Sequence, residues 1–254
     1  MILKRVECIV MDNKYSDNDL RNLYTAYGHF YNLDYGRYPT LPCRSILDLI
    51  DNRCLYTYIK KGGNITPSAV AIMMNPGCSR PLCDKQSPTY KKKSIPTKDW
   101  QLVETIPDDT QYQLMRLMIR YELKYIRVIN LTDVRNTDSK SLKPFLKEYS
   151  DNHHSIFSIF RELELHNILN SNPNAPIIAA WGVYDWLMDL IDPCWDSIND
   201  RIIVGYKKDS SEKLYYHPLP RKKYYKSELL PLEQWVYGII KSADPIFLPE
   251  VGRE

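Results

Sequence analysis

Short apolar runs of strand length recur along the chain, and each one stops abruptly at polar residues or glycine. Three of them lie at residues 69–74, 125–129 and 176–182, and a fourth strand or a hairpin covers residues 201–206 and 213–216. Segments with helical periodicity separate or follow these runs, at residues 110–123, 143–149, 155–170, 183–191 and 232–243. Strands that alternate with helices are typical of a mostly parallel sheet with right-handed crossovers. The pattern predicts an α/β fold: a three-layer αβα sandwich with a mostly parallel central sheet of about four core strands.

The segment before the first of these runs has a different pattern. A strand is expected at residues 2–11, a helix at 17–27, a short helix at 45–52 and a strand at 55–59. Two prolines stiffen the connector at residues 39–43, and a turn at residues 60–67 leads into the central strand. We therefore expect residues 1–66 to form an N-terminal appendage or cap packed on the core, and residues 67–254 to form the main domain.

Composition narrows the class of protein. The 254 residues are 44% apolar and 26% charged, which is ordinary for a globular chain with a large core. No apolar run approaches the length of a membrane span, and the first residues lack the zones of a signal peptide. We expect a cytoplasmic protein without membrane contact. The six cysteines form no CxxC pair, so we expect reduced thiols, no metal and no cofactor; Cys78 and Cys83 are the one pair close enough to test for a metal.

Basic residues are unevenly distributed although the net charge is only +3. They form three dense groups, at residues 91–93, 207–208 and 221–223, and tyrosines flank the last group. Basic groups mixed with aromatic side chains suit a nucleic-acid backbone and its bases. Each group taken alone is interpreted as solvated surface, as most charge runs are.

The loop after the first apolar run carries the first candidate chemistry. Pro76 fixes its own backbone and favours an extended Asn75, while Gly77 permits a positive φ or a close approach. The Asn75 side chain is therefore expected to be held in place at the carboxyl edge of the sheet, where open α/β sheets bind ligands. An ordinary turn at the end of a strand would account for the same residues.

Four strand ends carry motifs in a recognisable order. They are MMNPG at residues 73–77, VINLTDVR at 128–135, AAWG at 179–182 and YHPLPR at 216–221. In this order the motifs resemble the uracil-DNA glycosylase superfamily, over residues 68–243. The first motif is most similar to the mismatch-specific uracil and thymine glycosylase branch. The first three motifs are also similar to a family of uncharacterised bacterial domains with an Asn-Pro-Ser, Asn-Leu and Trp-Gly series.

The resemblance implies a uracil-DNA glycosylase-like fold and a monofunctional DNA glycosylase. Such an enzyme would hydrolyse the N-glycosidic bond of a flipped, modified or damaged pyrimidine and leave an abasic site. Asn75 and His217 would be catalytic: the amide would hold a water, and the imidazole would donate a hydrogen bond to the departing base. Asn130 would read the base edge, with Pro76 and Gly77 beside it.

The same resemblance implies DNA as the partner and no obligate protein partner. Tyr90 could face the flipped base, and the side chains expected on the DNA are those of Leu219, Arg221, Lys222, Lys223, Lys91 and Lys92. The chain departs from the family pattern here, because Leu219 comes early and Arg221 occupies the usual place of the leucine wedge. The long loop at residues 78–100 and the N-terminal segment are additions that suit a larger base. Bulky modified cytosines of phage DNA, and hence a role in defence, are one hypothesis.

The same residue types also suit purely structural roles. Asn75 and Asn130 could cap turns, and His217 could belong to an exposed loop. Trp181 suits a core anchor, and Cys78 a small buried filler rather than a thiol nucleophile. Two further classes of protein compete with the glycosylase: a non-catalytic nucleic-acid-binding module, and a hydrolase or transferase that acts on the N-glycosidic bond of free nucleosides or nucleotides.

Overall fold

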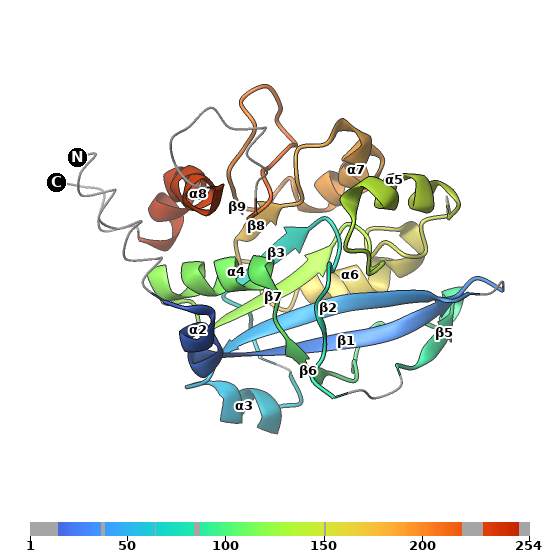
Figure 1. Cartoon of the computed structure of the whole chain (residues 1–254), viewed down its shortest axis with the longest axis horizontal. Coiled ribbons are helices and arrows are strands. Elements are labelled where there is room, and N and C mark those ends of the chain that lie inside the picture. The colour runs from blue at the N-terminus through green and yellow to red at the C-terminus, as the bar shows by residue number, and fades with distance from the viewer. Residues whose placement is uncertain are drawn as a thin grey trace.

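The computed structural model describes residues 15–36, 39–63, 65–83, 87–149, 151–219 and 231–248. Nine strands of this described part form one sheet in the order β4-β6-β1-β2-β7-β3-β8-β9, with β5 paired to β1 (Figure 1). The strands are β1 (Tyr24–Asp34), β2 (Leu41–Asp51), β3 (Ala69–Met73), β4 (Arg80–Pro81), β5 (Thr89–Lys91), β6 (Val103–Ile106), β7 (Tyr125–Asn130), β8 (Ile177–Ala180) and β9 (Ile203–Val204).

One half of the sheet is parallel, and the other half is antiparallel except for the parallel pair of β5 and β1. Strands β7, β3, β8 and β9 run parallel to one another, whereas β2 pairs antiparallel with both β7 and β1. Strand β6 continues the antiparallel half beside β1, and β4 pairs antiparallel with β6. The predicted α/β class is confirmed. The prediction of about four mostly parallel strands covers only half of the sheet. The other strands come from the segments before and after β3, which were not predicted to belong to the sheet.

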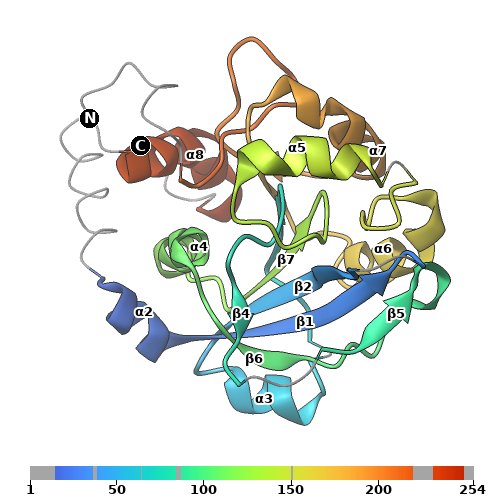
Figure 2. The same ribbon diagram turned by 45° about the vertical axis from the view of Figure 1, so that its right-hand side comes forward.

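Helices cover both faces of the sheet (Figure 2). One face packs against α5 (Ser139–Lys147), α6 (Glu162–Leu169) and α7 (Met188–Ile198). The other face packs against α2 (Asp17–Leu23), α4 (Asp109–Arg120) and α8 (Pro231–Phe247). The alternation within β3 explains how one strand serves both cores, since Val70 and Ile72 face the first set of helices and Ala69, Ala71 and Met73 face the second.

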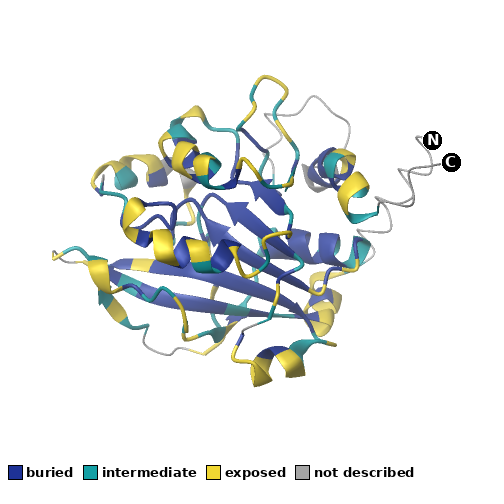
Figure 3. Ribbon diagram, turned by 180° about the vertical axis from the view of Figure 1, so that it is seen from behind, coloured by how far each residue is buried: buried dark blue, intermediate teal, exposed yellow. Residues whose placement is uncertain are grey.

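Burial is concentrated in the strands. Figure 3 shows the strands of the sheet as almost entirely buried, whereas exposed residues lie mainly on the outer surfaces of helices and in loops. A strand covered on both faces must be apolar at every position, which explains the continuous run of β3. Among the described helices, none combines the length and the apolar character that a bilayer span requires.

The N-terminal segment is part of the sheet, contrary to the prediction of an appendage at residues 1–66. Residues 45–52, expected to be helical, mostly belong to β2, and residues 55–59, expected to be a strand, lie in α3 (Leu55–Lys60). The helix expected at residues 17–27 ends at Leu23, where β1 begins. Strand β2 pairs with β7 of the parallel half, so residues 24–51 share one sheet with the expected catalytic domain. The strand expected at residues 2–11 lies outside the described residues.

The long connection after β3 holds several short elements. It contains β4, β5, the 3-10 helix η1 (Lys92–Ser94) and β6, where the sequence predicts a loop over residues 78–100. Helix α4 follows, and its capping box supports the helix expected at residues 110–123: the Asp108 carboxylate accepts from the backbone N–H groups of Thr110 and Gln111. Two further 3-10 helices, η2 (Ile159–Arg161) and η3 (Asp185–Leu187), precede α6 and α7.

Candidate functional site

Strands β7, β3 and β8 end at the same edge of the sheet, where Met73 pairs with both Asn130 and Ala180. The chain leaving β3 next forms a long helix on one face, α4, whereas the chains leaving β7 and β8 continue into α5 and α7 on the other face. Such a divergence opens a crevice at the carboxyl ends of parallel strands, which is where α/β sheets bind ligands. The ends of β3, β7 and β8 therefore lie at one edge, as the sequence predicts for these three strands.

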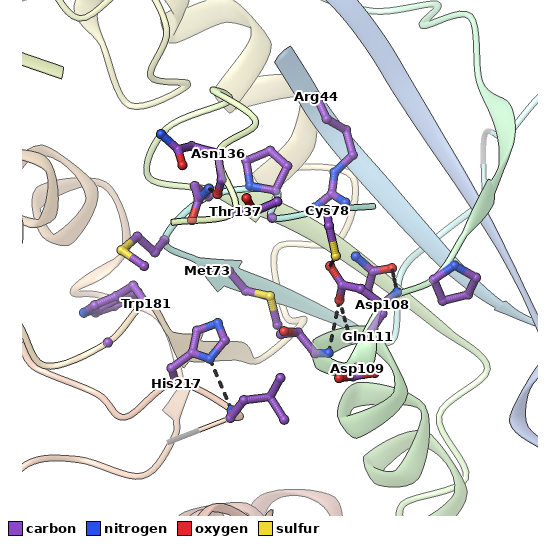
Figure 4. Close-up of a pocket in the computed structure, with 18 of the residues that line it drawn as sticks. Arg44, Met73, Cys78, Asp108, Asp109, Gln111, Asn136, Thr137, Trp181 and His217 are labelled. Atoms are coloured by element: carbon purple, nitrogen blue, oxygen red, sulfur yellow. Dashed lines mark hydrogen bonds between the residues drawn. The ribbon is translucent and has the colours of Figure 1, made fainter. Parts of the chain in front are cut away.

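A cavity of about 720 Å³ lies at this edge (Figure 4). Five segments and two arginines line it: residues 73–78, 106–111, 136–137, 181–184, part of 216–219, Arg44 and Arg80. In Figure 4, Trp181 and His217 lie on one side of the cavity, and Arg44, Cys78 and Asp108 lie on the other. A cavity of this size is within the range of small-molecule sites in proteins.

Asn75 is held in a defined orientation in the cavity wall. Its Nδ2 donates to the carbonyl oxygen of Asn136 at 2.6 Å and lies 3.4 Å from that of Val134. Because two carbonyl oxygens face Nδ2, the amide oxygen Oδ1 is the atom left to accept a hydrogen bond from a ligand or water. Pro76 is buried, and Gly77 has a φ of +64°, a conformation that favours glycine. The prediction that Asn75 is held rather than mobile agrees with these contacts.

His217 lines the same cavity from the other side. The backbone N–H of Leu219 donates to its Nδ1 at 3.2 Å, and Leu219 itself lines the cavity. Burial lowers the pKa of His217 to about 4. The ring is therefore neutral near neutral pH, and with Nδ1 accepting a hydrogen bond its proton lies on Nε2. His217 thus offers a neutral N–H donor.

Asn130 does not line the cavity. Its side chain is fully buried, and neither Oδ1 nor Nδ2 has a hydrogen-bond partner in the described part of the chain. The backbone explains this position, because Leu131 and Thr132 continue to hydrogen-bond to the carbonyl oxygens of Met73 and Met74. The chain leaves the sheet only beyond this point and brings Asn136 to the cavity instead. A base-reading role for Asn130 stays a prediction.

Tyr90, Lys91 and Lys92 lie away from the cavity, on and beside β5. The Tyr90 ring contacts those of His29 and Tyr31, with centroids 6.0 and 5.7 Å apart. Lys92 forms an ion pair with Asp151, and Lys91 is exposed. Strand β5 pairs with β1, and none of these three residues is among those that line the cavity. Arg221, Lys222 and Lys223 lie outside the described residues.

Arg44 is a cavity residue that the sequence interpretation missed. It comes from β2, next to a β-bulge: Gly28 and Phe30 of β1 pair with Leu47 and Arg44, so β2 carries one extra residue there. Bulges commonly redirect side chains beside functional sites. The signal in the sequence was a single arginine within an apolar stretch. We overlooked it because the following residues, 45–52, were interpreted as a helix.

Two further groups stand beside Arg44. Burial raises the pKa of Asp108, whose Oδ1 is occupied by the N–H groups at the start of α4. Cys78 is exposed and not the buried filler that the sequence favoured, because its loop turns outward at Gly77. Partial burial and the neighbouring Asp108 raise the pKa of the Cys78 thiol, so it is a poor nucleophile near neutral pH.

Trp181 serves the core and the cavity at once. Its side chain is fully buried, its Nε1 donates to the carbonyl oxygen of Lys213 at 3.0 Å, and its ring packs edge-on against Tyr215. The expected core anchor is therefore also a wall of the cavity. Gly182 follows with a φ of +105° and turns the chain away from the sheet.

Within the described ranges, no group of three or more histidine, cysteine or carboxylate side chains is arranged to hold a metal ion.

Comparisons of the chain with protein-family models, with curated proteins and with solved structures gave no match.

Proposed function

We propose that the protein is a DNA glycosylase that hydrolyses the N-glycosidic bond of a flipped, modified or damaged pyrimidine. The observation that carries this proposal is the shared cavity of Asn75 and His217, two side chains 142 positions apart in the chain. One offers an acceptor and the other a neutral donor. In the reaction, the water oxygen bonds to the anomeric carbon and gives up a proton, and the glycosidic bond breaks with its electron pair on the base. The base takes up a proton, so the products are an abasic site with a new hydroxyl group and the free base.

Asn75 positions the water. An amide cannot remove a proton, but its Oδ1 accepts a hydrogen bond from water and fixes the direction of the water oxygen. The contacts of Nδ2 with two backbone carbonyl oxygens oppose rotation of the amide, so Oδ1 remains the atom available to accept a hydrogen bond. Positioning of this kind accounts for a large share of the barrier reduction in enzymes.

His217 stabilises the departing base. Its Nε2–H donates to a base carbonyl oxygen as negative charge develops there, and the hydrogen bond from Leu219 keeps the ring in the required tautomer. A neutral donor suits this role over a wide pH range, since the pKa of His217 is only about 4. No lysine of the described residues lines the cavity, which favours water over an amine as the attacking group.

A second candidate function is hydrolysis or transfer at the N-glycosidic bond of a free nucleoside or nucleotide. It is favoured by the cations around the cavity: within the described residues they are Arg44 and Arg80, while Lys91 and Lys92 lie elsewhere. Affinity for oligonucleotides that falls steeply with salt is expected of the glycosylase and of a binding module, but not of an enzyme for free nucleotides.

The test is incubation of the protein with duplex oligonucleotides that contain uracil, mismatched thymine or bulky modified cytosines. Alkali converts an abasic site into a strand break, so cleavage reports base release. We expect at least one of these bases to be excised. Asn75→Ala is expected to lower the single-turnover rate about 100-fold, because the water loses its acceptor.

Thr137→Val is the matched control, since Thr137 also lines the cavity but is exposed. It should retain nearly the full rate. Absence of base release from every substrate, or an Asn75→Ala protein as fast as wild type, would disprove the proposal. Tight, salt-sensitive DNA binding without any base release would identify a non-catalytic binding module instead.

A further inference from the structure

The Arg44 guanidinium has no partner although it is buried. The residue is 1% exposed, its Nε and Nη1 have no hydrogen-bond acceptor in the part of the chain that the structure describes, and it lines the cavity. None of the ion pairs among the described residues includes it. An uncompensated buried charge is costly, so a group of this kind is expected to have a specific role.

Two other buried arginines do not share this isolation. Arg127 binds both carboxylate oxygens of Asp48 at 2.8 Å. Arg161 lies 2.6 Å from Asp133 and 2.8 Å from Glu164. The fold therefore pairs these buried guanidinium groups with carboxylates, and the one that lines the cavity is left unpaired.

The charges around Arg44 leave room for an anion. Burial, and the nearby charge of Arg135, lower the pKa of Arg44 to about 10, so it is still protonated near neutral pH. Asp108 opposes this effect through its charge, but its Oδ1 is already bound at the start of α4. Arg80 adds a second cation at the cavity, and Asp109 a second carboxylate.

Arg44 is directed toward the cavity, in which the guanidinium lies next to Cys78 and across from His217 (Figure 4). The guanidinium presents a planar fork of donors that matches the oxygens of a phosphate or carboxylate group. A neutral carbonyl group would satisfy a donor but would leave the charge uncompensated.

We propose that Arg44 binds an oxyanion of the ligand, a phosphate or carboxylate group, inside the cavity. The inference rests on the proposed function in one respect: the ligand is taken to be a pyrimidine nucleotide. The oxyanion then has two sources, the phosphate of the nucleotide itself or an acidic substituent on the base.

Calorimetric titration of the full chain separates these sources without requiring any excision. One pair of ligands is deoxycytidine 5′-monophosphate and deoxycytidine, and the other is 5-carboxyuracil and uracil. We expect one anionic ligand to bind wild type about 10-fold or more tightly than its neutral counterpart, as charge-assisted hydrogen bonds of this kind provide. Preference for the monophosphate identifies the phosphate, and preference for the carboxylated base identifies a substituent.

Arg44→Met should abolish this preference and leave the affinity for the neutral ligand unchanged. Arg80→Met is the comparison variant: Arg80 also lines the cavity, but its side chain is exposed and solvent screens its charge, so its loss should weaken the preference much less than Arg44→Met does. Arg44→Lys keeps the charge but loses the fork, and an intermediate preference is expected.

Two results would overturn the inference: no preference for either anionic ligand in wild type, or a preference that survives Arg44→Met. The outcome is independent of the excision assay. Base excision without an anion preference would refute only the proposed role of Arg44. An anion preference without base excision would refute only the proposed glycosylase activity.

Discussion

Replacement of Arg44 by methionine is expected to stabilise the protein in the absence of ligand. Burial lowers the pKa of this guanidinium to about 10. At about 1.4 kcal/mol for each pH unit of lowering, the charge costs the folded state about 3 kcal/mol. Methionine retains an unbranched apolar chain without the charge, and no carboxylate loses an ion-pair partner. We expect the free energy of unfolding to rise by about 1–3 kcal/mol.

Arg127→Met is the matched comparison, because Arg127 is also buried, at 5% exposed, but is paired. Its removal leaves Asp48 fully buried without its two charge-assisted hydrogen bonds. Loss of one partner of a buried ion pair typically costs about 3–5 kcal/mol. The same chemical substitution is therefore expected to have opposite signs at the two positions.

Urea unfolding followed by tryptophan fluorescence measures both effects, with the free energy extrapolated linearly to water. The slopes of the three proteins should agree, so that the midpoints alone report stability. The reasoning is refuted if Arg44→Met loses as much stability as Arg127→Met, since the guanidinium would then have a stabilising partner in the folded state.

Three further predictions concern the neighbouring residues. Gly77→Ala should lower the free energy of unfolding by about 1–2 kcal/mol in the same assay. The reason is that φ at Gly77 is +64° and an added Cβ would lie 3.1 Å from Asp108 Oδ2. An unchanged urea midpoint would contradict this prediction. Folding lowers the pKa of His217 from 6.5 to about 4, so the unfolded chain binds a proton first as the pH drops. The free energy of unfolding should therefore decrease between pH 6.5 and 4, by up to about 3 kcal/mol. The urea midpoint of His217→Gln should decrease less over the same pH range, and an equal decrease would exclude the effect. Cys78 lines the cavity and Cys83 does not, although both are exposed, so a ligand that fills the cavity should slow alkylation of Cys78 alone, as peptide mass spectrometry would detect. Equal protection of both thiols would place the ligand elsewhere.

The sequence by itself determined the parallel half of the sheet and the convergence of its strand ends. Residues 69–74 are a continuous apolar run too short for a helix that stops at Asn75, Pro76 and Gly77, and residues 125–129 are apolar except for Arg127. Because strands linked by helical crossovers run parallel, their polar ends had to meet at one edge. The end of the first apolar run indicated Asn75, the resemblance of the motif at residues 216–221 indicated His217, and helical periodicity with a cap predicted α4.

Only the tertiary structure decided the rest of the sheet and of the cavity wall. The apolar residues at positions 46, 47, 49 and 50 fit a helical face as well as a strand buried on both sides, and pairing with β1 and β7 selected the strand. The pairing of β2 with β1 also produced the bulge beside Arg44, and the pairing of β7 with β3 kept Asn130 within the sheet. Local periodicity records which positions are buried, but hydrogen bonds between distant segments determine which strands become neighbours and where their side chains point.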